Sequence, residues 1–320
     1  MTKWFVIFNP AARGEKSPRL LRFLEDKAKR LGHVTLAPTT GPGDARRLAA
    51  RAVAEGCHLI VAAGGDGTVN EVINGLGSAA CALGILPLGT VNVLARELGI
   101  PARLPAAWQV LESGTTRTID LGCAEPIAGD QATEEPSRPA RRCFAQLAGV
   151  GFDAWAVRRA SWELKKKIGP LSYLWAGLQT VAKPGATVEL RVPSTGFEVR
   201  GSAVLIGNGR YYGGSIPVFP RARMDDGRLD VCVFEKGGYL DVLRYAIAVI
   251  GGRHTRLRDV RYFQADRFEC RAAGTTPYEV DGELAGEAPV GFSVLPGALR
   301  VMVQAIGGPV ETDPGGSATR

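Results

Sequence analysis

Residues 59–76 combine an apolar run, a glycine-rich turn and a helical repeat in direct succession. Residues 59–63 are Leu-Ile-Val-Ala-Ala, typical of a buried strand, and residues 64–68 are Gly-Gly-Asp-Gly-Thr. From Val69 to Leu76, apolar residues recur at helical spacing. Glycines in such a turn let backbone N–H groups approach an anion, and the N-terminus of the helix favours negative charge. This stretch therefore predicts a phosphate-binding turn between a strand and a helix.

Part of the turn has a structural alternative. Thr68 followed by Glu71 three residues later fits a capping box, in which both side chains only close the start of the helix. That reading is as good as a functional one for Glu71 alone. It does not explain three glycines and an aspartate in one turn.

The first 120 residues alternate short strands with helices. Strands are expected at residues 3–8, 34–37, 59–63 and 83–86, and helices at 18–31, 44–55, 69–76 and 94–98. This alternation favours an α/β fold with a doubly wound parallel sheet, in which ligands gather beyond the carboxyl ends of the strands. The polar loops at 9–14, 39–43 and 64–68 should meet at that edge, together with Thr90 and Asn92, although either of these two residues also suits a helix cap.

The pattern changes after residue 120 to short alternating strands with frequent turns, which is typical of an antiparallel β-sandwich. We expect an α/β domain over residues 1–122, a β-sandwich domain over 123–306 and a disordered tail over 307–320. Residues 124–142 are expected to form a mobile surface loop. The predicted strands cover residues 143–148, 187–192, 198–208, 229–234, 259–263, 267–272, 277–280, 291–295 and 299–303.

The composition limits the classes of molecule that this protein can be expected to bind. The net charge of +7 favours an anionic partner, such as nucleic acid, an anionic lipid surface or a phosphorylated substrate. No apolar stretch reaches the roughly 20 residues of a membrane span. The six cysteines show no Cys-x-x-Cys spacing, which favours buried thiols in a reducing cytosol, and the three histidines form no metal-ligand pattern.

Two helical segments are expected to interrupt the sandwich. Residues 155–182 interleave basic side chains with tryptophans, which suits contact with an anionic bilayer surface, and residues 240–250 form a second apolar helix. Ordinary core packing with a solvated basic flank is an equally good reading of both. Nucleic-acid binding is not expected, because the basic residues are dispersed among apolar ones and form no known binding module.

An ordered set of motifs resembles the diacylglycerol kinase catalytic domain family, and within it the bacterial soluble lipid kinases that are related to sphingosine and ceramide kinases. The first motif is residues 64–72 (GGDGTVNEV) and the second is residues 87–92 (PLGTVN). The pentad alone also occurs in NAD kinases and phosphofructokinases, so the order of the whole set is the stronger signal. Further motifs in the same order are GVGFD at 149–153, GNGRYYGG at 207–214, DDGRLD at 225–230 and DGE at 281–283.

The resemblance implies a nucleotide-binding α/β half and a lipid-binding β-sandwich, with ATP and Mg²⁺ in the cleft. Asp281 and Glu283 match the acidic residues that activate the acceptor hydroxyl, with Glu283 the usual proton acceptor, and Asp66 is a further catalytic candidate. A cation site is implied at Arg223, Asp226 and Arg228. The implied nucleotide contacts are Asn9, Pro10, Ala11, Ala12, Arg13, Thr39, Gly64, Gly65, Asp66, Gly67, Thr68, Val69, Asn70 and Thr90.

From the residues alone, Asp281 and Glu283 would share one face if their segment were extended, whereas Asp-Gly favours a hairpin turn. The chain departs from the family at Val93, where an aspartate is common. The leading hypothesis is an ATP- and Mg²⁺-dependent lipid kinase, with diacylglycerol as one possible acceptor, peripherally bound to the cytoplasmic membrane face. An NAD kinase and a catalytically silent lipid- or nucleotide-binding module are the alternatives. The oligomeric state, a homodimer included, stays open.

Overall fold

The computed structural model describes residues 2–10, 12, 17–127, 141–151, 154, 187–272 and 274–305. Four parallel strands in the order β2-β1-β3-β4 form the N-terminal part of a larger sheet: β1 (Trp4–Phe8), β2 (Val34–Pro38), β3 (Leu59–Gly64) and β4 (Ala82–Pro87). β1, β3 and β4 are buried along their whole length, which explains their continuous apolar runs. The expected doubly wound α/β architecture is confirmed.

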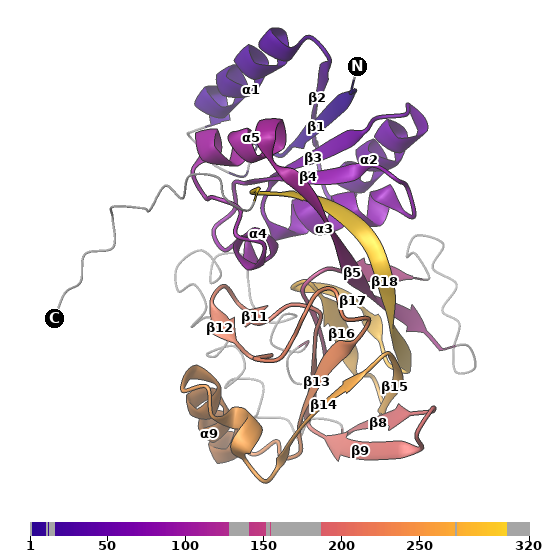
Figure 1. The fold of residues 1–320 in the computed structure, drawn as a ribbon. Helices are drawn as coiled ribbons and strands as arrows, with labels where there is room; N and C mark the ends of the chain where they lie inside the picture. The colour runs from indigo at the N-terminus through magenta and orange to yellow at the C-terminus, as the bar shows by residue number, and fades with distance from the viewer. Residues whose placement is uncertain are drawn as a thin grey trace, which may run out of the picture.

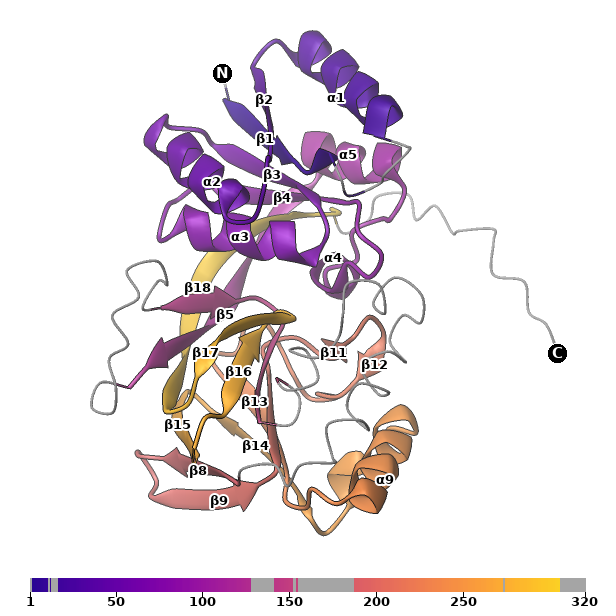
Figure 2. The same cartoon turned by 180° about the vertical axis from the view of Figure 1, so that it is seen from behind.

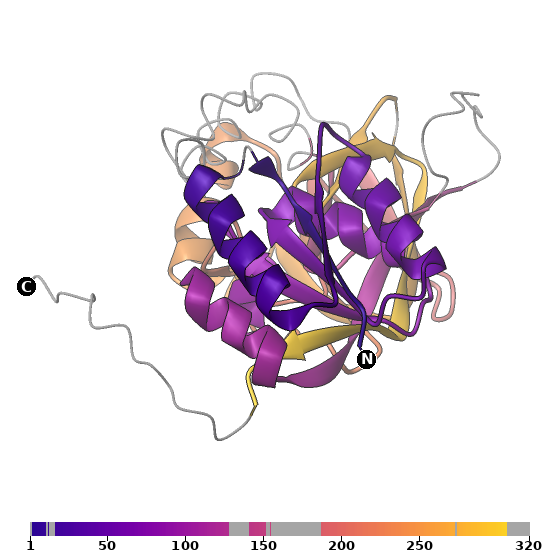
Figure 3. The same ribbon diagram turned by 90° about the horizontal axis from the view of Figure 1, so that it is seen from above.

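Helices cover both faces of this parallel sheet (Figures 1 and 3). α1 (Ser17–Leu31) and α5 (Leu104–Ser113) lie on one face, and α2 (Asp44–Ala54) and α3 (Asp66–Leu76) on the other. The fully buried indole of Trp108 in α5 packs between the rings of Trp4 and Phe23. The short helix α4 (Val93–Glu97) lies below the sheet in the view of Figure 1.

Two long strands connect the halves of the molecule. β5 (Thr115–Pro126) pairs antiparallel with β18 (Val290–Val303), and the end of β18 pairs in parallel with β4. The parallel sheet thus continues through β18 into β15 (Arg267–Ala272), β8 (Val188–Val192) and β9 (Phe197–Gly201). The boundary expected at residue 122 falls inside β5.

A second, antiparallel sheet completes the C-terminal sandwich (Figure 2). The core between the two sheets contains Phe292, whose ring contacts those of Phe268 and Tyr278. The strands, in the order β14-β13-β10-β7-β16-β17, are β14 (Val260–Ala265), β13 (Leu229–Phe234), β10 (Ala203–Gly207), β7 (Leu147–Gly151), β16 (Pro277–Val280) and β17 (Glu283–Glu287).

The single strand predicted over residues 198–208 is wrong. The structure has two strands there: β9 pairs with β8 in the first sheet, and β10 pairs with β7 and β13 in the second. Ser202 stands between them, and both its N–H and its hydroxyl donate to the Phe234 carbonyl. This corner lets one run of alternating residues change sheets, which alternation alone does not reveal.

Smaller elements flank the sandwich. β11 (Tyr211–Tyr212) and β12 (Ile216–Pro217) form a two-stranded ribbon, and α9 (Tyr239–Ile250) contacts β12. A 3₁₀ turn, η2 (His254–Arg256), follows α9. None of the helices in the described residues is long and apolar enough to cross a membrane. The insertion expected at 155–182 and the tail at 307–320 lie outside the described residues.

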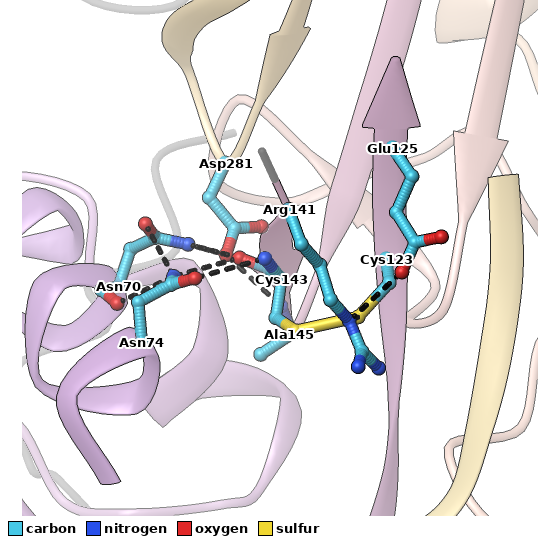
Figure 4. Close-up of a disulfide and its surroundings, with 8 residues drawn as sticks. All are labelled: Asn70, Asn74, Cys123, Glu125, Arg141, Cys143, Ala145 and Asp281. Carbon is cyan, nitrogen blue, oxygen red and sulfur yellow. Dashed lines mark hydrogen bonds and ion pairs between the residues drawn. A yellow bond between two sulfur atoms is a disulfide. The ribbon is translucent and has the colours of Figure 1, made fainter. Parts of the chain in front are cut away.

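β5 and the short strand β6 (Arg142–Phe144) are joined by a disulfide between Cys123 and Cys143 (Figure 4). The expectation of six free thiols is therefore wrong for this pair, because antiparallel pairing sets the two cysteines directly opposite each other. Their spacing of 20 residues gave no sign of it. The loop expected at 124–142 is also shorter than predicted, since Ala124–Pro126 belong to β5 and Arg142 to β6.

Candidate active site

The carboxyl ends of the parallel strands bring the predicted nucleotide-binding loops together. The N–H of Asn9 donates to the Ala63 carbonyl at 3.0 Å, and the N–H of Thr39 donates to the Phe8 carbonyl at 2.9 Å. The loop after β4 joins the same edge, because the N–H of Leu88 donates to the Gly64 carbonyl at 2.9 Å. Pro10, Ala12 and Thr90 lie on these loops, whereas Ala11 and Arg13 lie outside the described residues.

Two glycines let the first and second motifs touch backbone to backbone. A Cβ on Gly89 would lie 2.6 Å from the Cα of Gly65, so neither loop has room for a side chain there. Asn92 fixes the second loop: its Oδ1 accepts the N–H of Gly89 at 2.9 Å, and its Nδ2 donates to the Gly89 carbonyl at 2.8 Å. Asn92 itself has a left-handed backbone with a φ of 53°, which asparagine tolerates better than most residues.

α3 begins directly at the glycine turn, with Gly65 as its N-cap and Asp66 as its first residue. The first-turn amides of an α-helix have no carbonyl partner within the helix, so the start of a helix of this kind can bind an anion. The carboxylate of Asp66 turns to the second motif and accepts the N–H of Asn92 at 3.0 Å and of Val93 at 2.7 Å. Burial raises the pKa of Asp66 above its usual range, and the hydrogen bond from Val93 opposes this. Asp66 thus locks the two loops together.

Glu71 does not form a capping box with Thr68. Its carboxylate reaches α2 instead, accepting the N–H of Gly43 at 2.8 Å and of Ala45 at 3.0 Å. Glu71 therefore caps the neighbouring helix, where Gly43 has a positive φ and offers no side chain. The expectation that Glu71 caps a helix is correct, but the helix is α2 and not α3. A short stretch of sequence shows only partners on the same helix.

Asp281 and Gly282 form the two-residue turn of the hairpin between β16 and β17 (Figure 4). Both have positive φ, 47° and 82°, as a type I′ turn requires. The carboxylate of Asp281 points inward and accepts the Nδ2–H of Asn70 at 2.8 Å. It also accepts three backbone N–H groups at 3.0 Å each, from Ala145, Gln146 and Leu147. Burial raises the pKa of Asp281, and these hydrogen bonds oppose the rise.

Glu283, the first residue of β17, lies over the start of α3. A Cβ on Gly67 would be 2.7 Å from the Glu283 Oε1, so the carboxylate rests where the first turn of α3 has no side chain. The other oxygen is 3.3 Å from the Arg142 guanidinium, and the Glu283 side chain keeps 43% of its surface exposed. Burial raises the pKa of the Glu283 carboxyl above its ordinary value, and the Arg142 charge opposes the rise.

The hairpin separates the two acids that an extended segment would have placed on one face. Asp281 has both oxygens occupied by N–H donors, whereas Glu283 is partly exposed beside the glycine turn. Of the three predicted catalytic carboxylates, Glu283 is the one that the geometry leaves best placed to accept a proton from a substrate.

Sequence reasoning missed the polar contacts that join the two halves. Asn74 follows Asn70 by one helical turn, and it binds the backbone of Cys143 in both directions, accepting its N–H and donating to its carbonyl at 2.9 Å each. Arg210 pairs with Glu97 at 2.8 Å, linking the GNGRYYGG segment to α4. Two asparagines four residues apart on the apolar side of a predicted helix were the one available signal.

The implied cation loop makes hydrogen bonds to β5 and β14. Asp226 accepts the N–H of Arg228 at 3.1 Å and the Nε2–H of Gln264 at 3.3 Å, while Arg223 pairs with Asp225 at 3.3 Å. The loop is tied to β5, since Gly227 donates its N–H to Asp120 at 2.7 Å. Within the described ranges, no three acidic, histidine or cysteine side chains gather closely enough to hold a metal ion.

Comparisons with known proteins find relatives that span both halves of the chain. The model of the diacylglycerol kinase catalytic domain matches residues 3–124, and that of the YegS C-terminal NAD kinase beta sandwich-like domain matches residues 147–303. A "Probable lipid kinase YegS-like" of Pseudomonas aeruginosa is 37% identical over 280 residues, 85% of each chain. A "Diacylglycerol kinase" of Staphylococcus aureus is 30% identical over 292 residues, 90% of this chain and 88% of the relative.

The fold has a counterpart among solved structures. The crystal structure of a diacylglycerol kinase from Bacillus anthracis superposes with a TM-score of 0.74 and 25% sequence identity. The match covers 94% of this chain and 97% of that one.

Proposed function

The chain belongs to the diacylglycerol kinase catalytic domain family, and on that premise we propose that it is a lipid kinase that transfers the γ-phosphoryl group of ATP to the primary hydroxyl of a lipid such as diacylglycerol. The reaction class is phosphotransfer to an alcohol. The observation that carries the proposal is the position of Glu283, a carboxylate of the sandwich half that rests on Gly67 at the start of α3. It puts a proton acceptor of one half beside the anion-binding turn of the other.

The glycine turn supplies the phosphate-binding part of this proposal. First-turn amides of α3 and the loop after β4 face the same edge, and the Gly65–Gly89 contact leaves backbone groups rather than side chains there. Phosphoryl transfer depends mainly on positioning and on neutralising charge that moves to the leaving oxygen. Asp66 serves positioning, because it holds the second loop against the first.

A divalent cation fits this site as a companion of the nucleotide. The described residues offer no cage of three acidic ligands, and Mg²⁺ commonly keeps several waters and binds through one or two carboxylates plus substrate phosphates. When bound, Mg²⁺ would neutralise phosphate charge. Asp66 and Glu283 are the carboxylates of this chain that could bind it, directly or through water.

Glu283 acts as the general base in the proposed step. The lipid hydroxyl oxygen forms a bond to the γ-phosphorus, its proton passes to the Glu283 carboxylate, and the bond to the β–γ bridging oxygen breaks, releasing ADP. A positioned base of this kind contributes typically ~10²–10⁴-fold to the rate. The raised pKa of Glu283 suits this role, because a more basic carboxylate accepts a proton more readily. Asp281 positions the strands around it and takes no part in proton transfer.

The acceptor is drawn from a bilayer, and we place the enzyme at the cytoplasmic face of the membrane as a peripheral protein. The test is transfer of label from γ-labelled ATP to diacylglycerol, phosphatidylglycerol, a sphingoid base or NAD, with products identified by mass spectrometry. Label should enter a lipid, and Glu283→Gln should lower the rate at least about 100-fold while the protein stays folded. Label in NAD alone would identify the alternative NAD kinase activity. Binding of ATP without turnover on any acceptor would support a silent module.

A further inference from the structure

Helix α9 carries large apolar side chains on two opposite faces. One face packs inward: Val242 and Tyr245 are buried, and the Tyr245 ring packs on Phe234 at the outer side of the second sheet. The other face is open: Leu240 is 77% exposed, Ile247 64% and Ile250 63%. A surface helix normally turns charged or polar residues to water on its outer side.

We call Tyr239, Leu240, Leu243, Ile247 and Ile250 the α9 face. From Leu240 they recur at intervals of three and four residues, so they form one stripe about 15 Å long at a rise of ~1.5 Å per residue. Eight large apolar side chains are exposed in the described part of the chain, and five of them belong to this stripe. Such a concentration of exposed apolar surface marks an interaction site rather than scattered surface residues.

Positive charge surrounds the α9 face. Residues 235–261 carry a net charge of +3. The acidic residues of this segment are occupied, because Arg244 pairs with Asp241 and Asp259, and Arg261 pairs with Glu235. Three exposed arginines after the helix, Arg253, Arg256 and Arg258, have no ion-pair partner in the described ranges. An apolar stripe beside unpaired arginines has the character of a helix that lies in the interface of an anionic bilayer.

We infer that the α9 face is the surface by which this protein docks on a membrane containing anionic lipids, an inference that rests on the proposed function because a lipid kinase must take its acceptor from a bilayer. A second copy of the chain is a poorer occupant. An isologous contact through this face would bring the unpaired arginines of both copies near each other at one interface. An anionic surface instead receives the apolar side chains and the arginines together.

The place of α9 in the fold agrees with this docking mode. α9 contacts β12, β12 pairs with β11, and β11 contacts α4 of the nucleotide-binding half. These elements follow one another along one flank of the molecule in both Figure 1 and Figure 2. The loop between β11 and β12 reaches the second motif. A Cβ added to Gly214 in this loop would lie 3.1 Å from the Cγ1 of Val91. Docking through α9 therefore presents to the bilayer the flank that leads to the active site.

Cosedimentation with vesicles tests the inference without catalysis. The full-length protein is mixed, without nucleotide, with vesicles of phosphatidylcholine alone or with added phosphatidylglycerol. We expect binding to the anionic vesicles that weakens with salt. Leu240→Gln combined with Ile247→Gln should reduce the partition coefficient by at least about tenfold, and Arg253→Gln combined with Arg256→Gln should abolish most of the preference for phosphatidylglycerol. Leu21→Gln, at an exposed apolar position on α1, is the matched control and should bind like the wild type.

A fluorescent probe shows what covers the face. Ile247→Cys in a Cys81→Ser background is labelled with an environment-sensitive dye, since the other free cysteines are buried. The dye should report water in the protein alone and an apolar environment once anionic vesicles are added. An apolar signal without vesicles would overturn the inference. In that case sedimentation velocity distinguishes a second copy, which gives a dimer, from cover by the chain itself, which gives a monomer.

The two proposals fail separately. Activity on a short-chain diacylglycerol dissolved as monomers reports the proposed function and should be unchanged in the Leu240→Gln, Ile247→Gln variant. Activity on diacylglycerol in anionic vesicles should fall with vesicle binding. Equal vesicle binding by the variant and the wild type would refute docking through α9, whatever the enzyme phosphorylates.

Discussion

Asn70 in the N-terminal half donates a hydrogen bond to Asp281 in the C-terminal half, 211 positions later, at 2.8 Å. Both side chains belong to the motifs that resemble the kinase family, yet in this contact they stabilise the structure. Asn70 is 2% exposed, and Asp281 holds the segment that leads from β6 into the first residue of β7 through three further N–H groups. The hydrogen bond therefore ties the phosphate-binding helix to the sandwich that carries Glu283.

Asp281→Asn should destabilise the protein, because the new amide presents a donor to groups that are themselves donors. Each carboxylate oxygen accepts two hydrogen bonds, so at least one pair is lost whichever way the amide turns. We expect a loss of about 3 kcal/mol in the free energy of unfolding, measured by urea denaturation.

Glu283→Gln is the control for this variant. It should remove activity and keep wild-type stability within about 1 kcal/mol, since the Glu283 side chain is 43% exposed. Equal stability of the two variants would mean that Asp281 does not hold the halves together.

Gly67→Ala should remove most of the activity without unfolding α3. The added Cβ would lie 2.7 Å from the Glu283 Oε1, so the carboxylate must move away from the turn. Alanine is otherwise favourable within a helix, and Gly67 has no positive φ to lose. We expect kcat/KM to fall at least about tenfold with an unchanged melting temperature.

Gly291→Ala is the comparison for that variant. Its added Cβ meets neighbours only at ordinary van der Waals distance, 3.7 Å or more, and Gly291 stands in β18. It should retain full activity. If Gly67→Ala were as active as Gly291→Ala, Glu283 would not work from its position over α3.

The sequence predicted the features that depend on residues close together in the chain. It did not predict the contacts between residues that are far apart in the chain. Continuous apolar runs and the glycine turn predicted β3, α3 and the edge where the loops meet, because strand, turn and helix are adjacent in the chain. The Asp281-Gly282 dipeptide likewise indicated the hairpin that formed. The N–H donors that Glu71 binds, the pairing of Cys123 with Cys143, and the change of sheet at Ser202 depend on segments that only the fold brings together. For the same reason, periodicity could not show that Asp281 is enclosed while Glu283 is partly exposed.

The disulfide between Cys123 and Cys143 gives a prediction that needs no substrate. Thiol titration of the denatured protein should find four thiols before reduction and six after it. Closing a loop of this length stabilises a fold by about 3 kcal/mol, so reduction or Cys123→Ser should lower the melting temperature. Six thiols in the unreduced protein would show that the pair is not joined under those conditions.

Reduction should also affect the site, since Cys143 is held by Asn70 and Asn74 of α3 and precedes the strand segment that Asp281 binds (Figure 4). We expect a change in kcat on reduction that Cys123→Ser reproduces. Cys81→Ser provides the control, because Cys81 is a free cysteine outside this pair.

The ion pair between Arg142 and Glu283 predicts how activity depends on pH. Glu283 accepts a proton only when it is ionised, so kcat/KM should fall as the pH drops through the raised pKa of this carboxyl, which lies above the ordinary 4.5. The Arg142 charge, 3.3 Å away, lowers that pKa.

Arg142→Gln removes the opposing charge, so the pKa of Glu283 rises further and the acidic limb of the profile moves to higher pH. Arg142→Lys keeps the charge and should leave the limb near its wild-type position, although a lysine cannot reproduce the guanidinium geometry. The measurement is kcat/KM with a monomeric lipid acceptor between pH 5 and about 8. A limb that stays in place in Arg142→Gln would show that a group other than Glu283 controls the proton transfer.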